Sequence, residues 1–220
     1  MTHLKGLKGL LRNTARALIF VAMAGLAACG RDIAYMKPLA AGESALRSNA
    51  QSATLVFGQA GRMTTGNLFT ILDEHGKFVG DLPGHSAFAI TVPPSRHLFV
   101  LMSFDHRKED ILYTDMQAGG VYYVDVIDGN HPLFERRQGY FWPSKRGGDP
   151  LYTLSNLGEH LKDATWNQPD VEAGNRYLAS RPAETQEAMT DANEARAREE
   201  KAPTLATLMH TIAPDDALPP

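Results

Sequence analysis

The sequence predicts a mainly β protein: an antiparallel β-sandwich of about seven strands, followed by a helical C-terminal region. Two observations predict this fold. Between residues 51 and 142, short apolar runs recur every ~8–12 residues with turn-forming residues between them, which is typical of a sandwich. After residue 150, apolar residues recur at helical spacing and the chain becomes rich in Ala and charge.

Residues 1–28 are predicted to be a cleaved export signal. Four basic residues and no acidic one precede a purely apolar run at 17–28 (ALIFVAMAGLAA). A membrane-spanning helix needs about 20 such residues, whereas the apolar region of a signal peptide needs only about 7–15. The positive flank keeps the N-terminus in the cytoplasm during insertion, so the segment fits export better than a permanent span.

The apolar run ends in Leu26-Ala27-Ala28-Cys29-Gly30, which resembles the lipobox of bacterial lipoproteins. In that family the Cys thiol receives a diacylglyceryl group, the signal is cut before the Cys, and the new N-terminus is acylated. The resemblance implies a lipid anchor on Cys29. In the enteric sorting rule, Asp after the Cys retains the protein at the inner membrane, so Gly30 implies the outer membrane. The alternative is an ordinary Ala-x-Ala-like cleavage site and a chance Cys.

The cysteine count and the net charge limit the ligands and surfaces that the mature chain is expected to bind. Cys29 is the only cysteine, so neither an intramolecular disulfide nor a Cys-based zinc cluster can form. Loss of the four basic residues in 1–28 takes the formal charge from −3 to −7, which argues against docking on anionic lipid or nucleic acid. Two or more acyl chains anchor stably. We therefore expect a membrane protein of the bacterial envelope, held by its lipid with the body facing the periplasm.

Residues 29–50 lack sustained periodicity and are predicted to be a tether. Residues 51–142 are predicted to form the sandwich. The run at 97–104 is apolar on both faces, which predicts a central strand. The seven expected strands, separated by Gly- and Pro-containing turns, lie at 53–58, 67–72, 77–82, 86–92, 97–104, 110–116 and 121–127.

Two motifs within the predicted sandwich carry a second resemblance. Val92-Pro-Pro-Ser-Arg-His97 and Ala118-Gly-Gly-Val-Tyr-Tyr-Val124 stand at the separation found in PEGA-like domains of small bacterial envelope lipoproteins. The stretch resembles that family, although the family Gly is Ser95 here. The resemblance implies a sandwich scaffold in the envelope, and it offers no catalytic residues to carry over.

The C-terminal part is predicted to be helical. Residues 143–181 are interpreted as a linker and a helix packed on the sandwich, and residues 182–220 as a solvated helix with a frayed tail. Pro182 suits a first helical turn, and Met189 is nearly the only large apolar residue of 182–201. The packing helix is predicted from apolar residues at helical spacing and one cap pair: Leu154, Leu157, Leu161 and Ala164, with Asn156 and Glu159.

Candidate catalytic residues are few, and each has a structural alternative. The segment Gly84-His85-Ser86-Ala87-Phe88 departs from the Gly-x-Ser-x-Gly nucleophile elbow at Phe88, and a strand follows it. Paired carboxylates could do acid–base work or form a solvated turn; these are Asp105, Glu109 and Asp110. Clustered histidines could bind Zn²⁺ or Cu²⁺ or lie singly at turns; these are His75, His85, His97, His106 and His131.

Aromatic side chains beside arginine favour interfaces, and one segment combines them: Arg136, Arg137, Tyr140, Phe141 and Trp142. We expect it to dock a protein or a glycan; the alternative is a loop that seats Trp142 against the sandwich.

The function expected is therefore a non-catalytic structural or interaction module with an envelope protein partner, no metal and no cofactor. The competing hypothesis is a metal-binding protein or hydrolase with a site at one pole of the sandwich.

Overall fold

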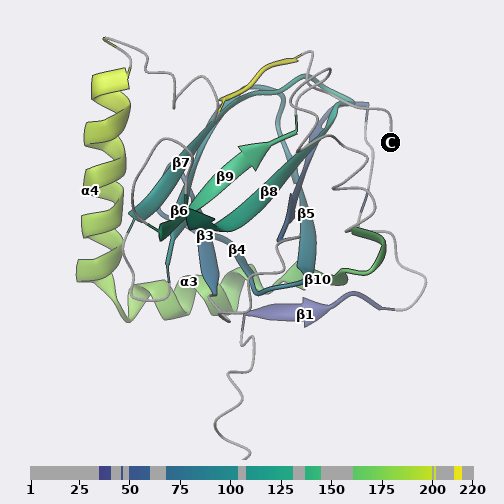
Figure 1. Ribbon diagram of the computed structural model, residues 1–220, viewed down its shortest axis with the longest axis horizontal. Coiled ribbons are helices and arrows are strands. Elements are labelled where there is room, and N and C mark those ends of the chain that lie inside the picture. Colours follow the sequence, from purple (N-terminus) through teal and green to yellow (C-terminus); the bar gives the residue numbers. More distant parts are fainter. Residues whose placement is uncertain are drawn as a thin grey trace, which may run out of the picture. The chain divides into compact units, whose positions relative to one another are not determined.

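The computed structural model of the 220-residue chain describes residues 35–40, 46, 50–59, 68–103, 108–130, 137–144, 161–199, 201 and 211–214. The described part is mainly β, with two sheets and two C-terminal helices, so the predicted fold class is confirmed (Figure 1). Residues 35–220 form one compact unit.

Each sheet mixes predicted strands with short additions at its edges. Sheet A runs β1 (Met36–Pro38), β10 (Thr165–Pro169), β5 (Ser86–Val92), β2 (Ala53–Gly58), β8 (Val121–Asn130) and β9 (Arg137–Pro143). Sheet B runs β11 (Thr211–Ile212), β7 (Lys108–Asp115), β6 (Arg96–Met102), β3 (Phe69–Asp73) and β4 (Phe78–Leu82). Neighbouring strands are antiparallel except in three parallel pairs, β10–β5, β2–β8 and β11–β7.

All seven predicted strands are present, and each begins within two residues of its expected start. Strands β2 and β5 match their predicted bounds at both ends. The prediction of a central strand at 97–104 is also confirmed, because β6 lies between β7 and β3 and is buried from Leu98 to Met102.

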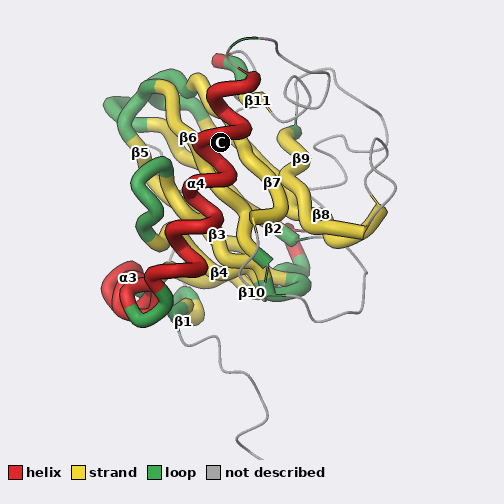
Figure 2. Tube along the Cα trace, turned by 90° about the vertical axis from the view of Figure 1, so that its left-hand side faces the viewer, coloured by secondary structure: helices red, strands yellow, loops and turns green. Residues whose placement is uncertain are grey.

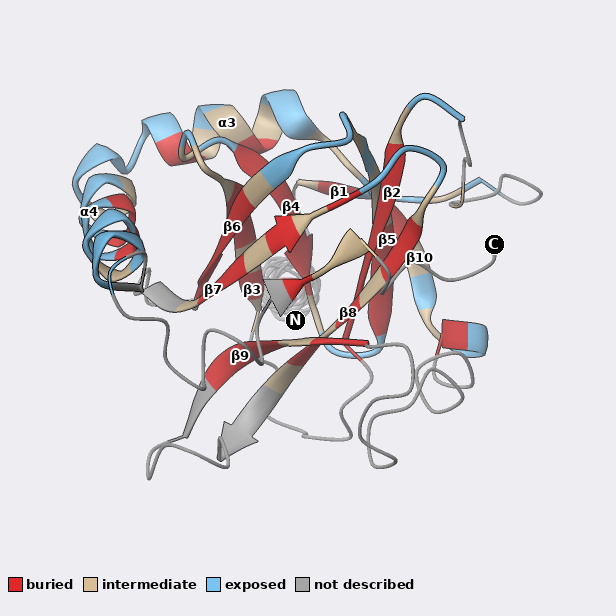
Figure 3. Ribbon diagram, turned by 90° about the horizontal axis from the view of Figure 1, so that it is seen from above, coloured by how far each residue is buried: buried red, intermediate tan, exposed pale blue. Residues whose placement is uncertain are grey.

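The core between the sheets is built around Phe57. Its ring centroid lies 5.3 Å from that of Phe88 and 6.0 Å from that of Phe141, both in sheet A. It lies 5.6 Å from that of Phe99 in sheet B, so one side chain joins the two layers. All four rings are buried, as Figure 3 shows for the strands that carry them. Such aromatic burial supplies much of the free energy that holds two sheets together.

A second apolar cluster covers the outer face of sheet A. Val56, Ala87 and Val121 alternate with the core residues along their strands and pack together with Leu161. Ala164 and Trp166 pack against the same cluster. The predicted packing helix thus has its described end on the sandwich, although residues 151–160 lie outside the described part.

Strand β4 is the edge of sheet B, and other elements cover it. Asn175 of α3 (Val171–Ala179) accepts a hydrogen bond from the Phe78 amide at 3.0 Å, and the sulfur of Met36 accepts one from the Asp81 amide at 3.2 Å. Gly174 lets α3 approach, because a Cβ there would lie 2.2 Å from the Phe78 ring. The otherwise open edge, a route to aggregation, is therefore closed within the chain.

Helix α4 (Pro182–Glu199) confirms the helix predicted from Pro182, but not its solvation. It lies against β6 and β7 on the outer side of sheet B (Figure 2). Ala188, Met189 and Ala192 are buried there. These small residues form one stripe, which lets the helix lie close to the sheet. The low hydrophobicity of the segment suggested a solvated helix, but it reflects the narrow width of the stripe that contacts the sheet.

Three other predictions are wrong in part. The expected tether 29–50 contains β1, whose residues Met36–Pro38 pair with β10. The expected linker and packing helix 143–181 contains β10 and α3. The expected frayed tail contains β11, which pairs with β7. Each error concerns a segment of nine residues or fewer that is ordered by contacts distant in sequence.

In the described residues, no helix combines the length and apolar character that a membrane span requires.

Candidate functional site

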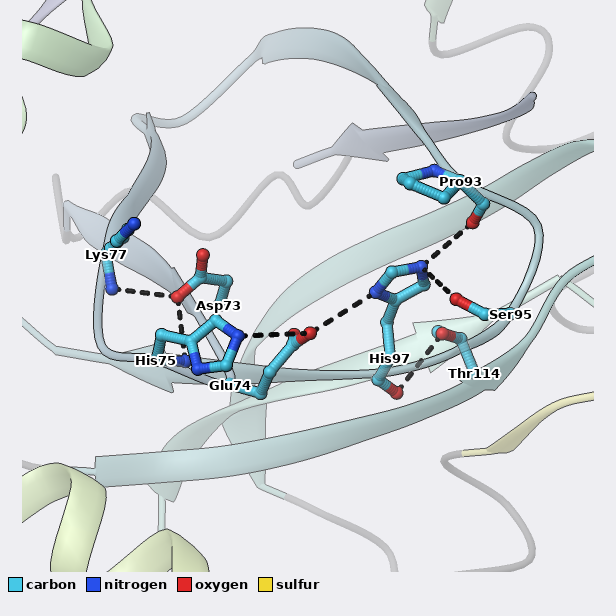
Figure 4. Close-up of polar contacts among 8 residues, drawn as sticks. All are labelled: Asp73, Glu74, His75, Lys77, Pro93, Ser95, His97 and Thr114. Carbon is cyan, nitrogen blue, oxygen red and sulfur yellow. Dashed lines mark hydrogen bonds and ion pairs between the residues drawn. The ribbon is translucent and has the colours of Figure 1, made fainter. Parts of the chain in front are cut away.

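The candidate site lies where the β3–β4 turn meets the β5–β6 connection (Figure 4). Asp73 ends β3, and its Oδ1 accepts hydrogen bonds from the amides of His75 and Lys77, both at 2.9 Å. Gly76 closes the turn with a φ of +72°, a conformation that favours glycine. This turn fixes the backbone of Glu74, which projects toward the neighbouring strand.

Glu74 lies between two imidazoles. Its Oε1 is 3.5 Å from Nδ1 of His97 and 4.0 Å from Nε2 of His75. Only 13% of the His97 side chain is exposed, against 71% for His75. His97 is therefore part of the packed structure, whereas His75 faces solvent.

His97 is also held at its other ring nitrogen. Nε2 lies 2.9 Å from the Pro93 carbonyl oxygen and 3.0 Å from Oγ of Ser95. The chain thus brings together a hydroxyl, an imidazole and a carboxylate in the order Ser95–His97–Glu74. This order of groups is that of a catalytic triad of the Ser-His-Glu kind.

The Pro93 carbonyl decides how this triad-like arrangement can act. A carbonyl oxygen only accepts hydrogen bonds, so the 2.9 Å contact requires a hydrogen on Nε2 of His97. With that hydrogen in place, Nε2 has no lone pair with which to take the Ser95 proton. The arrangement is suited to pinning the β5–β6 connection to the β3–β4 turn more than to activating a nucleophile.

The site also lacks the features of a metal centre. Among the residues that the structure describes, no three His, Cys, Asp or Glu side chains are grouped so as to hold a metal ion. Of the other predicted histidines, His106 and His131 lie outside the described residues. His85 lies in the β4–β5 turn with a φ of +58°, and its backbone bonds to Gln59 and Thr165.

Two of the remaining catalytic candidates, Ser86 and Asp110, make contacts that stabilise the fold. Ser86 is 3% exposed, and its Oγ donates to the Pro83 carbonyl at 2.7 Å at the start of β5. Asp110 lies in β7, not in a loop, and its Oδ2 accepts from the Phe141 amide at 2.7 Å, joining β7 to β9. Glu109 is also in β7, but its side chain lies outside the described part. Asp105 lies outside the described residues altogether.

The predicted interaction segment is mostly strand and core. Tyr140 and Phe141 are buried in β9, because the Asp110 contact and the pairing with β8 draw this strand onto the sandwich. Trp142 is half-buried, and its ring lies 6.0 Å from that of Tyr140. Arg136 and the Arg137 side chain lie outside the described residues. The expectation that this segment docks a protein or a glycan is therefore wrong for Tyr140 and Phe141, because both are buried.

Sequence reasoning missed the grouping of Glu74, Ser95 and His97, although it identified both turns that supply them. One local signal was available: residues i and i+2 on an extended chain point to the same side, which places Ser95 beside His97. The approach of Glu74 depends on β3 and β6 being neighbours in sheet B. Cys29 lies outside the described residues.

In comparisons with known proteins, no protein-family model matches this chain, and no curated protein matches it.

Proposed function

We propose that this chain is a bacterial envelope lipoprotein, anchored by lipid on Cys29, whose β-sandwich body is a non-catalytic structural or interaction module facing the periplasm. The observation that carries the proposal is the order of the N-terminal features. A basic segment, an apolar run and the lipobox-like Leu26-Ala27-Ala28-Cys29 follow one another, and the rest of the chain has no cysteine. A free thiol would be a liability in an oxidising compartment, whereas a thioether is not.

The body supports a non-catalytic role through what its candidate groups do. Ser86 and Asp110 are each engaged by backbone partners, and His97 donates to a carbonyl. The PEGA-like pattern around Val92 and Ala118, proposed on sequence alone, is consistent with a scaffold of this kind.

Substitution of the anchor tests the proposal directly. Cys29→Ser should yield an uncleaved precursor that incorporates no radioactive palmitate. Gly30→Ala is the matched control, since it retains the thiol and should be cleaved and labelled. Label persisting in Cys29→Ser would sink the assignment.

The proposed outer-membrane location has its own test. Gly30→Asp places an acidic residue directly after the lipidated cysteine, the position that the enteric sorting rule reads. We expect the variant to remain palmitate-labelled but to move to the inner-membrane fraction on a sucrose gradient. An unchanged distribution between the two membrane fractions would remove the argument for the outer membrane. It would leave the proposed lipid anchor on Cys29 unaffected.

An envelope partner is proposed at the β9 side of sheet A, around Trp142. Cross-linking in intact cells should give partner bands that are weakened by Trp142→Ala and restored by Trp142→Phe. The chain's other tryptophan, Trp166, is also half-buried and donates through Nε1 to the Leu161 carbonyl at 3.2 Å. Trp166→Ala is thus a matched control for lost aromatic packing, and identical patterns in both Ala variants would exclude this surface.

A second candidate function is acyl hydrolysis at Ser95, favoured by its 3.0 Å contact with His97 and by Glu74 behind that ring. A fluorophosphonate probe distinguishes the two. Under the primary proposal, wild type and Ser95→Ala stay equally unlabelled. Labelling of wild type that is lost in both Ser95→Ala and His97→Gln would establish the hydrolase instead.

A further inference from the structure

The chain connecting Cys29 to the sandwich is short. Strand β1 begins at Met36 and is already paired with β10, so only the six residues 30–35 separate the proposed anchor from the first strand. Fully extended, the chain from Cys29 to Met36 reaches at most about 25 Å. Had the chain stayed a tether until β2, the reach would have been roughly 80 Å by the same measure. Strand β1 must therefore stay near the bilayer surface if Cys29 is lipidated.

Strand β1 forms one end of the molecule together with α3. Lys37 of β1 makes an ion pair with Asp170, the N-cap of α3, at 2.6 Å. Tyr35 packs between Tyr177 of α3 and Phe78, with ring centroids 4.7 and 6.1 Å away. Figures 1 and 2 both show β1 and α3 side by side, with α4 rising away from them. We call the exposed surface of β1 and α3 the β1–α3 edge.

Two features of the β1–α3 edge suit a lipid surface. Val171, the first residue of α3, is the one large hydrophobic side chain among the described residues that is exposed, at 49%. The cations of β1 and α3 each have an anion beside them, in the pairs Lys37–Asp170 and Arg176–Glu172. In a mature chain of formal charge −7, a locally balanced edge meets little repulsion from anionic headgroups.

Resting on the proposed anchor at Cys29, we infer that the β1–α3 edge is the membrane-facing surface of this protein, with Val171 in contact with the phospholipid headgroups. The far end of α4 and the strand ends beside it then point away from the bilayer. Helix α4 has 18 residues, so its C-terminal end stands about 27 Å from its start next to α3.

Single-cysteine labelling tests this orientation, because a lipidated Cys29 has no thiol and the body has no other cysteine. The lipidated protein carries an environment-sensitive maleimide fluorophore at Val171→Cys, at Ala179→Cys on the exposed side of α3, or at Ala197→Cys near the end of α4. It is reconstituted in vesicles of phosphatidylethanolamine and phosphatidylglycerol that contain a headgroup-nitroxide lipid.

Quenching at positions 171 and 179 should be several-fold stronger than at 197. Equal quenching at all three positions, or stronger quenching at 197, would overturn the inference. A flexible twenty-residue Gly/Ser insertion after Gly30 should abolish the difference in quenching between positions 171 and 179 and position 197. If that difference persists undiminished, the short connection to Cys29 is not what orients the body.

Failure of the proposed anchor gives a different result. If Cys29 is not lipidated, the wild-type protein itself reacts with the maleimide and fails to sediment with vesicles. The orientation is judged only on protein that sediments and whose wild-type form is unreactive, so the two failures are separable.

Discussion

At the scale of single residues, Tyr122 joins the connection between β7 and β8 to the C-terminal segment of the chain. Its hydroxyl accepts a hydrogen bond from the Gln117 amide at 2.9 Å and donates one to the Pro214 carbonyl at 3.2 Å. Gly120 makes room for this, because a Cβ there would lie 2.7 Å from the ring. A tyrosine near the start of a strand that bonds back a few residues resembles the tyrosine corner of immunoglobulin-like sandwiches.

Tyr122→Phe should lower the free energy of unfolding by about 1–3 kcal/mol, because the two hydrogen bonds of the hydroxyl, each worth about 0.5–1.5 kcal/mol, are lost. Urea denaturation followed by tryptophan fluorescence measures the change. The matched control is Tyr123→Phe, on the opposite face of β8, where we expect a change within about 0.5 kcal/mol. Equal effects at the two positions would contradict the role assigned to the Tyr122 hydroxyl.

Gly174 provides a second prediction at this scale. Alanine is favoured over glycine inside a helix by about 1 kcal/mol, but here its Cβ would lie 2.2 Å from Phe78. Overpacking of this kind costs about 1–3 kcal/mol, so Gly174→Ala should destabilise the protein. Gly84→Ala, where no atom lies within 4 Å, should leave the denaturation midpoint unchanged or slightly raised. A stabilised Gly174→Ala would mean that α3 does not pack on β4 in solution.

At the scale of elements, alternation and turn chemistry predicted the seven strands β2 to β8. The short strands β1, β10 and β11 were missed, since two to five residues carry no periodicity. Helix α3 was missed because Gly174 and Asn175 lower its helix propensity, yet both are required where it packs on Phe78. Strand β9 was taken for a docking segment because nothing local to Tyr140 and Phe141 reveals the Asp110 contact.

The N-cap of α3 gives a pH prediction. The hydrogen bond from Lys37, followed by that from the Ala173 amide, lowers the pKa of Asp170 from its ordinary 3.8. A lowered pKa in the folded state means that the carboxylate stabilises the fold above pH 3.8, and that this contribution is lost as the pH falls further. The wild type should therefore lose more stability between pH 6 and pH 3 than Asp170→Asn, which retains a capping side chain.

Urea midpoints measured across this pH range check the prediction. Lys37→Met removes the donor instead of the acceptor and should flatten the profile in the same direction. Profiles that run parallel in wild type and Asp170→Asn would show that Asp170 contributes nothing to the acid sensitivity.

At the scale of the whole molecule, the C-terminus completes sheet B. Ile212 is buried and β11 pairs in parallel with β7, 98 residues earlier in the chain. Ile212→Ala should lower the free energy of unfolding by about 2–5 kcal/mol, and Ile212→Val by about 0.5–1.5 kcal/mol. Thermal denaturation of the two variants gives the ranking, and wild-type stability in Ile212→Ala would mean that β11 is not docked.

The candidate site was only half predictable at this scale. The two turns that form it follow from Gly76 and from Pro93-Pro94, and His97 was among the histidines singled out. The contact between Glu74 and His97 depends on the pairing of β3 with β6. The contact of the Pro93 carbonyl with Nε2 of His97 depends on the backbone path between the sheets. Neither is encoded in residue type or spacing.

The late position of β11 has a consequence for biogenesis. Synthesis from the N-terminus delivers β7 well before Thr211 and Ile212. Until then the amides and carbonyls along that margin lack their parallel partner, and such ladders recruit other extended chains. A premature stop codon or a protease nick upstream of Thr211 would make that exposure permanent, so quality-control proteases and holdase chaperones should capture the truncated species.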